Sequence, residues 1–209
     1  MIKYEQISCR FERCGRTEAA NAFSGFIEVE DEIYKTHGTE YGDVGHQYFR
    51  GIVRDAADGR ACPIYGEYFM PENMGTLMRF YKLSSDAKAS PASFVHELEA
   101  GQNGIVGFGA WSPRFPEDSW TEHTECNIEK LPIERARGCG VVQYLADEFA
   151  KADAMLSPAM KEVQANYVWQ KVATVMGVDN APAIFGTRKR EPKFEPSQES
   201  KIIKFIPEK

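Results

Sequence analysis

The chain has 209 residues, of which 43% are hydrophobic and 27% charged, and its net charge is −6. These values are typical of a globular protein that buries one sizeable core. A general nucleic-acid-binding protein would usually carry a basic face, whereas here the basic residues gather only in the short run "TRKR" at 187–190. Nucleic acid is therefore not expected as the main partner.

The N-terminal segment and the cysteines indicate a cytosolic protein. The opening "MIKYEQISCRFERC" carries charges throughout and does not resemble a signal peptide, and no apolar run approaches the roughly 20 residues that span a bilayer. Five scattered cysteines favour reduced thiols over a disulfide framework, and no CxxC pair predicts a metal site. We expect no membrane contact and no metal.

The first hundred residues alternate between strand and helix patterns. Residues 2–12 predict a strand, and 17–38 predict a helix because apolar residues recur at roughly helical spacing. Residues 46–70 predict two strands around the turn "AADGR", and 76–83 predict another strand. A capped helix is expected over 85–104, with His96 on its surface.

The second half predicts a strand–helix alternation. Strands are expected at 104–111 and 126–133, an amphipathic helix at 141–156, a brief strand at 159–164 and a helix at 166–178. The tail offers two strand-like pieces, 184–188 and 201–206, which form either a terminal hairpin or an extended arm. This order indicates a mixed α/β layout.

The stretch "LPIERARGCGVVQYL", residues 131–145, has the features of an anion-binding loop. A loop that leaves a strand and enters a helix exposes the first free N–H groups of that helix. Gly138 and Gly140 let a ligand approach the backbone, and Arg135 and Arg137 add charge suited to phosphates. The loop lacks the spacing of a Walker or dinucleotide-binding motif. It is therefore a candidate site for a pyrophosphate.

The spacing P-x-x-R-x-x-G-x-G in this loop resembles the acyl-coenzyme A loop of the GNAT superfamily of N-acetyltransferases. "QNGIVGFGAW" upstream is similar to a strand of that family. Asn166 and Gly177 are eleven residues apart, which is the spacing of an asparagine and a glycine in a later segment of the family pattern. The resemblance covers about residues 100–209. It implies an α/β (α+β) fold in which one mixed, largely antiparallel twisted sheet is flanked by helices and has a splayed central strand pair.

The resemblance also implies a domain plan and a cosubstrate. The chain would be one domain, with residues 1–103 on the acceptor side, 104–185 as the acyl-coenzyme A core and 186–209 as a closing hairpin or arm. Acetyl-coenzyme A would be the cosubstrate, its pantetheine beside Leu131 and Asn166. Its pyrophosphate would lie near Arg135 and on the N–H groups of Arg137, Gly138, Cys139, Gly140 and Val141.

In this reading the protein moves an acetyl group to an amine, carried by a small molecule or a protein. Glu125 and His123 are the first candidates for the base, with Glu122 beside them in an acidic run whose charge favours a cationic acceptor. Ala173 stands where many family members have a tyrosine acid. The alternative is a non-catalytic member of the fold that associates, as a homo-oligomer or in an assembly, through residues 187–209.

Overall fold

The computed structural model describes residues 2–11, 22–84, 91–112 and 121–176, except for the side chains of 121–123. The strands are β1 (Ile2–Phe11), β2 (Ala22–Glu30), β3 (Tyr34–Thr39), β4 (Gly42–Asp55), β5 (Ala61–Pro71), β6 (Leu77–Lys82), β7 (Ala92–Ala100), β8 (Ile105–Ser112) and β9 (Thr121–Leu131). The helices are α1 (Ile133–Gly138), α2 (Val141–Met155) and α3 (Pro158–Val175).

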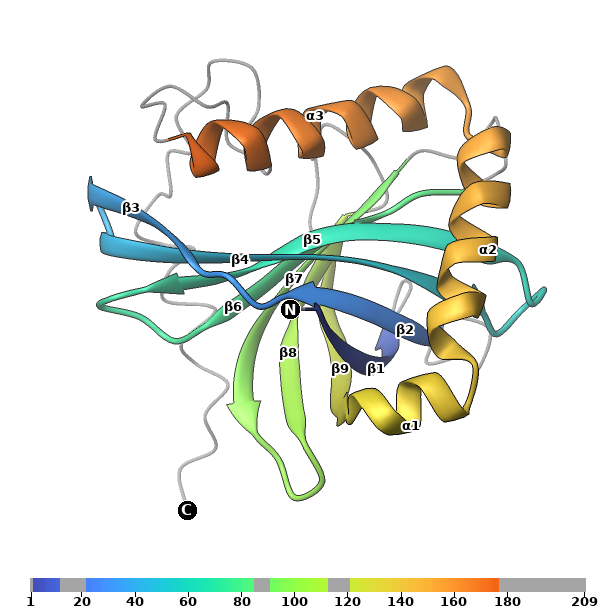
Figure 1. Cartoon of the computed structure of the whole chain (residues 1–209). Helices are drawn as coiled ribbons and strands as arrows, with labels where there is room; N and C mark the ends of the chain where they lie inside the picture. Colours follow the sequence, from blue (N-terminus) through green and yellow to red (C-terminus); the bar gives the residue numbers. More distant parts are fainter. Residues whose placement is uncertain (1, 12–21, 85–90, 113–120, 177–209) are drawn as a thin grey trace.

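Eight of these strands close into an antiparallel barrel (Figure 1). The sheet order is β2-β1-β9-β8-β7-β6-β5-β4-β3, and β2 also pairs with β4, which joins the two ends. The long strand β4 makes this closure because its two halves have different partners. Its first part pairs with β3 through His46, and its second part pairs with β2 from Phe49 to Asp55.

The barrel interior is a packed core. Side chains alternate along each strand, so that Cys62, Ile64 and Tyr68 of β5 belong to the inner cluster while Tyr65 packs on the outside. Four phenylalanines with less than 2% exposure fill the centre: Phe23, Phe49, Phe80 and Phe94. An eight-stranded barrel is just wide enough to be filled by such side chains.

Glycines allow close approach between neighbouring strands. A Cβ on Gly66 of β5 would lie 2.2 Å from the carbonyl oxygen of Arg79 on β6, and one on Gly109 would lie 1.8 Å from that of Val95. Both contacts are far inside van der Waals distance. Any larger residue at these positions would force the strands apart.

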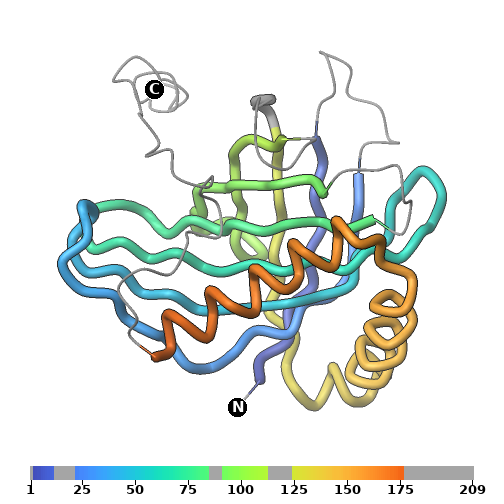
Figure 2. The backbone as a smooth tube through the Cα atoms, turned by 90° about the horizontal axis from the view of Figure 1, so that it is seen from above, coloured from blue at the N-terminus to red at the C-terminus, as the bar shows by residue number. Residues whose placement is uncertain are grey.

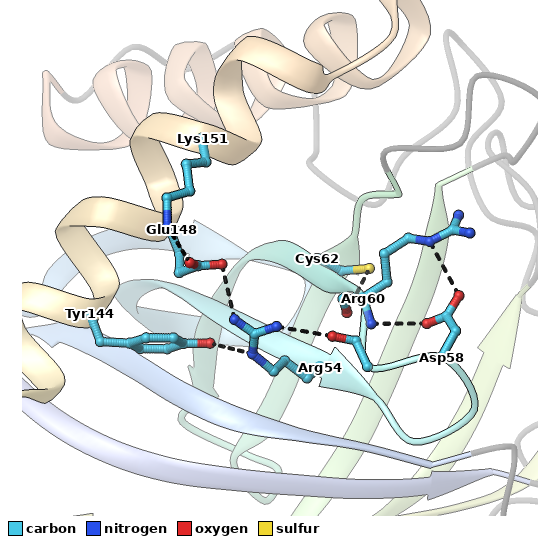
Figure 3. A network of polar contacts seen from close by, with 8 residues as sticks. Arg54, Asp58, Arg60, Cys62, Tyr144, Glu148 and Lys151 are labelled. Atoms are coloured by element: carbon cyan, nitrogen blue, oxygen red, sulfur yellow. Dashed lines mark hydrogen bonds and ion pairs between the residues drawn. The ribbon is translucent and has the colours of Figure 1, made fainter.

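The three helices cover one side of the outer barrel wall (Figure 2). α1 and α2 pack on β1, β2 and β4 through Ala136, Leu145 and Phe149, and α3 packs over Tyr48, Tyr65 and Tyr81. Figure 3 shows a surface network that ties α2 to the β4–β5 hairpin. In it, Arg54 donates to Tyr144 Oη at 3.1 Å and to Glu148 at 3.2 Å.

This architecture overturns the expected fold. The expectation of a GNAT-like open sheet flanked by helices is wrong, because the sheet closes on itself and helices cover only part of its outside. The expected helix over 17–38 is wrong where the chain is described, since β2 and β3 lie there. The expected helix over 85–104 contains β7, and the expected strand at 159–164 is part of α3.

The errors have a common physical cause. Phe23 and Ile27 are four residues apart, a spacing that places side chains on one face of a helix and equally on one face of a strand. In β7 the inward Phe94 and His96 alternate with Val95 and Glu97, but the glutamate- and alanine-rich composition favours helix. Tertiary pairing decided the outcome in both segments.

Other predicted elements are confirmed. β1, the β4–β5 hairpin, β6, β8 and α2 lie where the sequence predicts them, and β9 includes the strand expected from residue 126. The tail pieces at 184–188 and 201–206, and the arm at 187–209, lie outside the described residues. Within the part of the chain that is described, no helix is long and apolar enough to cross a bilayer.

Candidate active site

The predicted pyrophosphate loop is a helical corner. Leu131 ends β9, and Arg135, Arg137 and Gly138 belong to α1. Gly140 has a φ of 71° and precedes α2, which starts at Val141. The N–H groups of Cys139 and Gly140 donate to the carbonyls of Arg135 and Arg137, so the chain itself uses at least two of the five donors expected for the ligand.

The remaining parts of the predicted cofactor site are not beside this corner. Asn166 is an exposed residue of α3, whereas the corner lies at the opposite end of α2, whose 15 residues rise about 22 Å (Figure 1). The strand that would splay from β9 to admit pantetheine is absent, because residues 159–164 are helical. Ala173, at the position expected for the tyrosine acid, is buried against the barrel.

The predicted base residues lie on β9, earlier in the strand than Leu131, after which the corner begins. Glu125 is exposed on the outer face of this strand and accepts a hydrogen bond from Asn127 at 3.3 Å. Glu122 and His123 lie in β9 next to a register shift opposite Gly109 and Ala110, and their side chains are outside the described part. The structure does not bring these carboxylates to the α1–α2 corner.

A different set of residues has the geometry of a catalytic relay. Thr36 of β3, His46 of β4 and Glu67 of β5 lie in series on the outer barrel wall. The distance from Thr36 Oγ1 to His46 Nε2 is 3.1 Å, and that from His46 Nδ1 to Glu67 Oε2 is 2.7 Å. A hydroxyl, an imidazole and a carboxylate in this order form the arrangement that activates a nucleophile.

Strand pairing positions these three side chains. Tyr34 pairs with His46 and Thr36 with Val44, so Thr36 reaches His46 diagonally across the same face. His46 in turn pairs with Phe69, and Glu67 lies two residues earlier on that face of β5. The β-branched Thr36 suits a strand, where its χ1 is restricted. The site is therefore built on the sheet rather than on a flexible loop.

Glu67 is the buried anchor of the relay. Its side chain is only 2% exposed, and its second oxygen, Oε1, accepts a hydrogen bond from Arg79 of β6 at 2.6 Å. Burial pushes the pKa of Glu67 up, but the Arg79 guanidinium and the His46 hydrogen bond outweigh it and hold the pKa below its ordinary value. Glu67 is thus ionised at neutral pH.

The ionised acid determines the tautomer of His46. A carboxylate accepts hydrogen bonds and has none to donate, so the proton between the two groups resides on Nδ1 of His46. In the neutral imidazole, Nε2 then has a free lone pair that accepts the hydroxyl proton of Thr36. Glu67 orients the base, and the base faces the hydroxyl.

Aromatic side chains adjoin the relay on the same face of the sheet. The ring of Phe69 meets His46 edge-on at 5.5 Å, and the Arg79 guanidinium stacks over Phe69 at 3.8 Å. His46 keeps 13% of its side chain exposed, and Thr36 is half-buried. β3 pairs with β4 on one side and with no other described strand, so part of its backbone N–H groups are not used by the sheet.

Sequence reasoning missed this site because its members come from three strands. No local motif marks the three segments that supply the relay, "YKTHGTEYG", "GHQYF" and "YGEYF". Thr36 also lies within residues 17–38, for which the sequence predicts a helix. The two strands predicted over 46–70 contain His46 and Glu67, but their burial patterns do not alternate clearly enough to assign a face to either residue. Only the register between the strands brings them together.

A second histidine lies inside the barrel. His96, expected on a helix surface, is fully buried on β7, with its ring parallel to Phe80 at a 10° interplanar angle and 5.9 Å between centroids. Its Nε2 is 2.8 Å from Thr124 Oγ1, and its Nδ1 has no hydrogen-bond partner among the described residues. Burial lowers the pKa of His96 to about 4, so the ring is neutral.

No group of described residues has the makeup of a metal site. Comparison of the chain with protein-family models, with curated proteins and with solved structures gave no match. The resemblance to GNAT acetyltransferases is therefore wrong, since the barrel contradicts the fold on which it depends. The roles assigned to the α1–α2 corner and to β9 stay predictions.

Proposed function

We propose that the protein is a hydrolase that cleaves small esters, with Thr36 as nucleophile, His46 as general base and Glu67 as the group that orients the base. The observation that carries this proposal is the unbroken series of two hydrogen bonds, 3.1 Å and 2.7 Å long, that ends on a buried carboxylate. A nucleophile within reach of a base that a third group orients is the signature of covalent catalysis.

The first half of the reaction forms an acyl-enzyme. Thr36 Oγ1 attacks the ester carbonyl carbon while its proton passes to His46 Nε2, and Glu67 stabilises the imidazolium that results. The carbon–oxygen bond to the leaving alcohol then breaks. His46 gives its proton to the departing oxygen, so the alcohol leaves neutral and the acyl group stays on Thr36 as an ester.

Water completes the cycle. It attacks the acyl carbon of the Thr36 ester and passes one proton to His46 Nε2. The bond to Thr36 Oγ1 breaks, the hydroxyl regains the proton, and a carboxylic acid is released. A backbone N–H on the outer edge of β3, which pairs with no described strand other than β4, is the proposed donor to the oxyanion of both tetrahedral intermediates.

The acetyltransferase activity and the cytosolic location expected from the sequence are not part of this proposal. Transfer of an acetyl group from acetyl-coenzyme A to an amine, the identity of that amine and the cytosolic location stay predictions that no observation tests. The splayed strand pair on which the cofactor role depended is absent, so the acetyltransferase is not what the geometry favours. The ester hydrolase is supported by three relay residues that all lie in the described part of the chain.

The test is hydrolysis of p-nitrophenyl acetate and butyrate by the full chain and by matched variants. We expect Thr36→Val and His46→Gln to lower kcat/KM at least 100-fold, and Thr36→Ser to retain most of the activity. Thr39→Val is the control, because the Thr39 hydroxyl donates to Gly42 in the adjoining turn and not to the relay. It should change kcat/KM less than 3-fold.

Mass spectrometry locates the nucleophile. A fluorophosphonate probe should modify Thr36 in the wild-type chain and leave Thr36→Val unmodified. Hydrolysis that survives in His46→Gln, or a probe found on another residue, would overturn the proposal. A wild-type rate equal to that of His46→Gln for both esters would do the same.

A further inference from the structure

α3 is apolar on two opposite faces. Its inner face packs on the barrel through Met160, Val163, Tyr167, Gln170 and Ala173. Its opposite side is the α3 outer face, which consists of Ala165, Val168, Trp169, Val172, Val175 and Met176. Trp169 is 58% exposed and Met176 71% exposed, so large apolar side chains project from the protein here. A surface helix normally has one apolar stripe, so a second apolar face on the opposite side indicates that this side is covered too.

The neighbouring helix shows the contrast. α2 buries Leu145 and Phe149 on the barrel, and its outward positions include Asp147 and Lys151 among small alanines. That distribution is ordinary for a surface helix, in which one stripe faces the core and the other faces water. The α3 outer face departs from it in the same molecule. Its exposed residues are contiguous along the helix, unlike single surface apolar residues, which need no explanation.

The spacing of the outer face suits a second helix. Ala165, Trp169, Val172 and Met176 follow each other at intervals of four, three and four residues. This is the repeat that forms a straight seam between two helices crossing at a shallow angle. The expected partner is therefore a helix with the same apolar seam, rather than an extended strand or a small molecule.

The charge pattern favours a second copy of the same chain. Between Ala165 and Met176 the only charged side chain of α3 is Lys171, which forms an ion pair with Glu30 of β2. Two chains of net charge −6 repel each other overall, but this face brings no like charges together when it meets itself. In an antiparallel pair, Trp169 of each copy would lie opposite Val172 of the other.

The area also suits a dimer. From these exposures and the usual size of the side chains, the α3 outer face offers roughly 500 Å² per chain. If it is fully covered, two copies would bury about 1,000 Å² in total, the minimum area expected of a biological interface. We propose that the protein forms a two-fold symmetric dimer through antiparallel packing of the α3 outer faces. This interface is independent of the proposed ester hydrolysis, and it differs from an association through residues 187–209.

Analytical ultracentrifugation of the full chain tests the proposal. The wild-type protein should sediment as a concentration-dependent dimer. The double variant Trp169→Glu/Val172→Glu should raise the dimer dissociation constant at least 100-fold, because it places four carboxylates in one apolar seam. Met155→Glu is the matched control, since Met155 is 63% exposed but lies on α2, and it should leave the dissociation constant within 3-fold.

Circular dichroism of the double variant should match that of the wild type, which separates loss of the dimer from loss of the fold. Wild-type protein that sediments as a monomer up to its solubility limit would overturn the proposal. So would a dimer that the double variant leaves intact. If the double variant unfolds, the single variant Val172→Glu replaces it in the test. The proposal then requires that Val172→Glu weakens the dimer.

Discussion

Tyr48 of β4 donates a hydrogen bond to Thr174 Oγ1 at 2.8 Å and so joins the strand that carries His46 to the last turn of α3. About two helix turns earlier in α3, Tyr167 donates to the main-chain carbonyl of Phe49 at 2.9 Å. These two bonds link residues far apart in the sequence. They hold α3 over the outer wall beside the candidate active site.

The Tyr167 bond should contribute measurably to stability. Tyr167 is buried, so Tyr167→Phe removes a hydrogen bond that water cannot replace, and we expect a loss of about 1 kcal/mol in the free energy of unfolding. Urea denaturation measures it. Tyr144→Phe is the control, because the Tyr144 hydroxyl meets Arg54 near the surface (Figure 3). An equal loss in both variants would contradict this assignment.

Gly66 should tolerate no side chain. The Cβ of Gly66→Ala would collide with the Arg79 carbonyl and the Phe80 side chain, so we expect a loss of about 2 kcal/mol or more in the free energy of unfolding. Gly138→Ala is the matched control. Nothing lies within 4 Å of a Cβ at Gly138, and this residue is the last of α1. The free energy of unfolding of Gly138→Ala should therefore stay within about 0.5 kcal/mol of the wild-type value.

His96 should make the barrel less stable in mild acid. Its pKa is about 4 in the fold and near 6.5 in the unfolded chain, so between these values the unfolded state binds more protons. The free energy of unfolding therefore falls as the pH drops, by about 2 kcal/mol from about pH 7.5 to about pH 5. Above the unfolded pKa this contribution is constant.

Chemical denaturation of His96→Leu isolates this effect from the titration of carboxylates. The difference in unfolding free energy between the two pH values should be smaller in His96→Leu than in the wild type by the same amount. His37→Gln serves as a control, since His37 is an exposed residue paired with Asp43. A wild-type slope that persists in His96→Leu would show that another group titrates.

Substitutions at Glu67 and Thr36 should differ in their effect on stability, although both residues belong to the proposed relay. Glu67→Gln removes the charge that compensates a largely buried Arg79, and we expect a loss of about 3 kcal/mol in the free energy of unfolding. Thr36→Val keeps the shape of a half-buried strand residue and should change stability by less than about 0.5 kcal/mol. Thermal and urea unfolding of both variants, beside the ester assay, distinguish the two roles. Equal destabilisation by both would assign Thr36 a structural role.

Much of the local structure follows from the sequence alone. Loose alternation predicts β1, the turn "AADGR" between two strand-like runs predicts β4 and β5, and an almost wholly apolar run predicts β8. The amphipathic pattern that includes Val141, Leu145 and Phe149 predicts α2. The net charge of −6 and the absence of an apolar run long enough to span a bilayer can also be read from the sequence alone. These properties depend on residues that are close together in the sequence, so they can be predicted from the sequence without knowledge of the fold.

Only the tertiary structure decided the rest. Phe23 and Ile27 fit a helix and a strand equally well, and the pairing of β2 with both β1 and β4 made the choice and closed the barrel. The pairing of β3 with β4 and of β4 with β5 set the register that places Thr36, His46 and Glu67 in series. Strand partners are distant in sequence and are selected by the fit of the whole sheet, so no local pattern contains them.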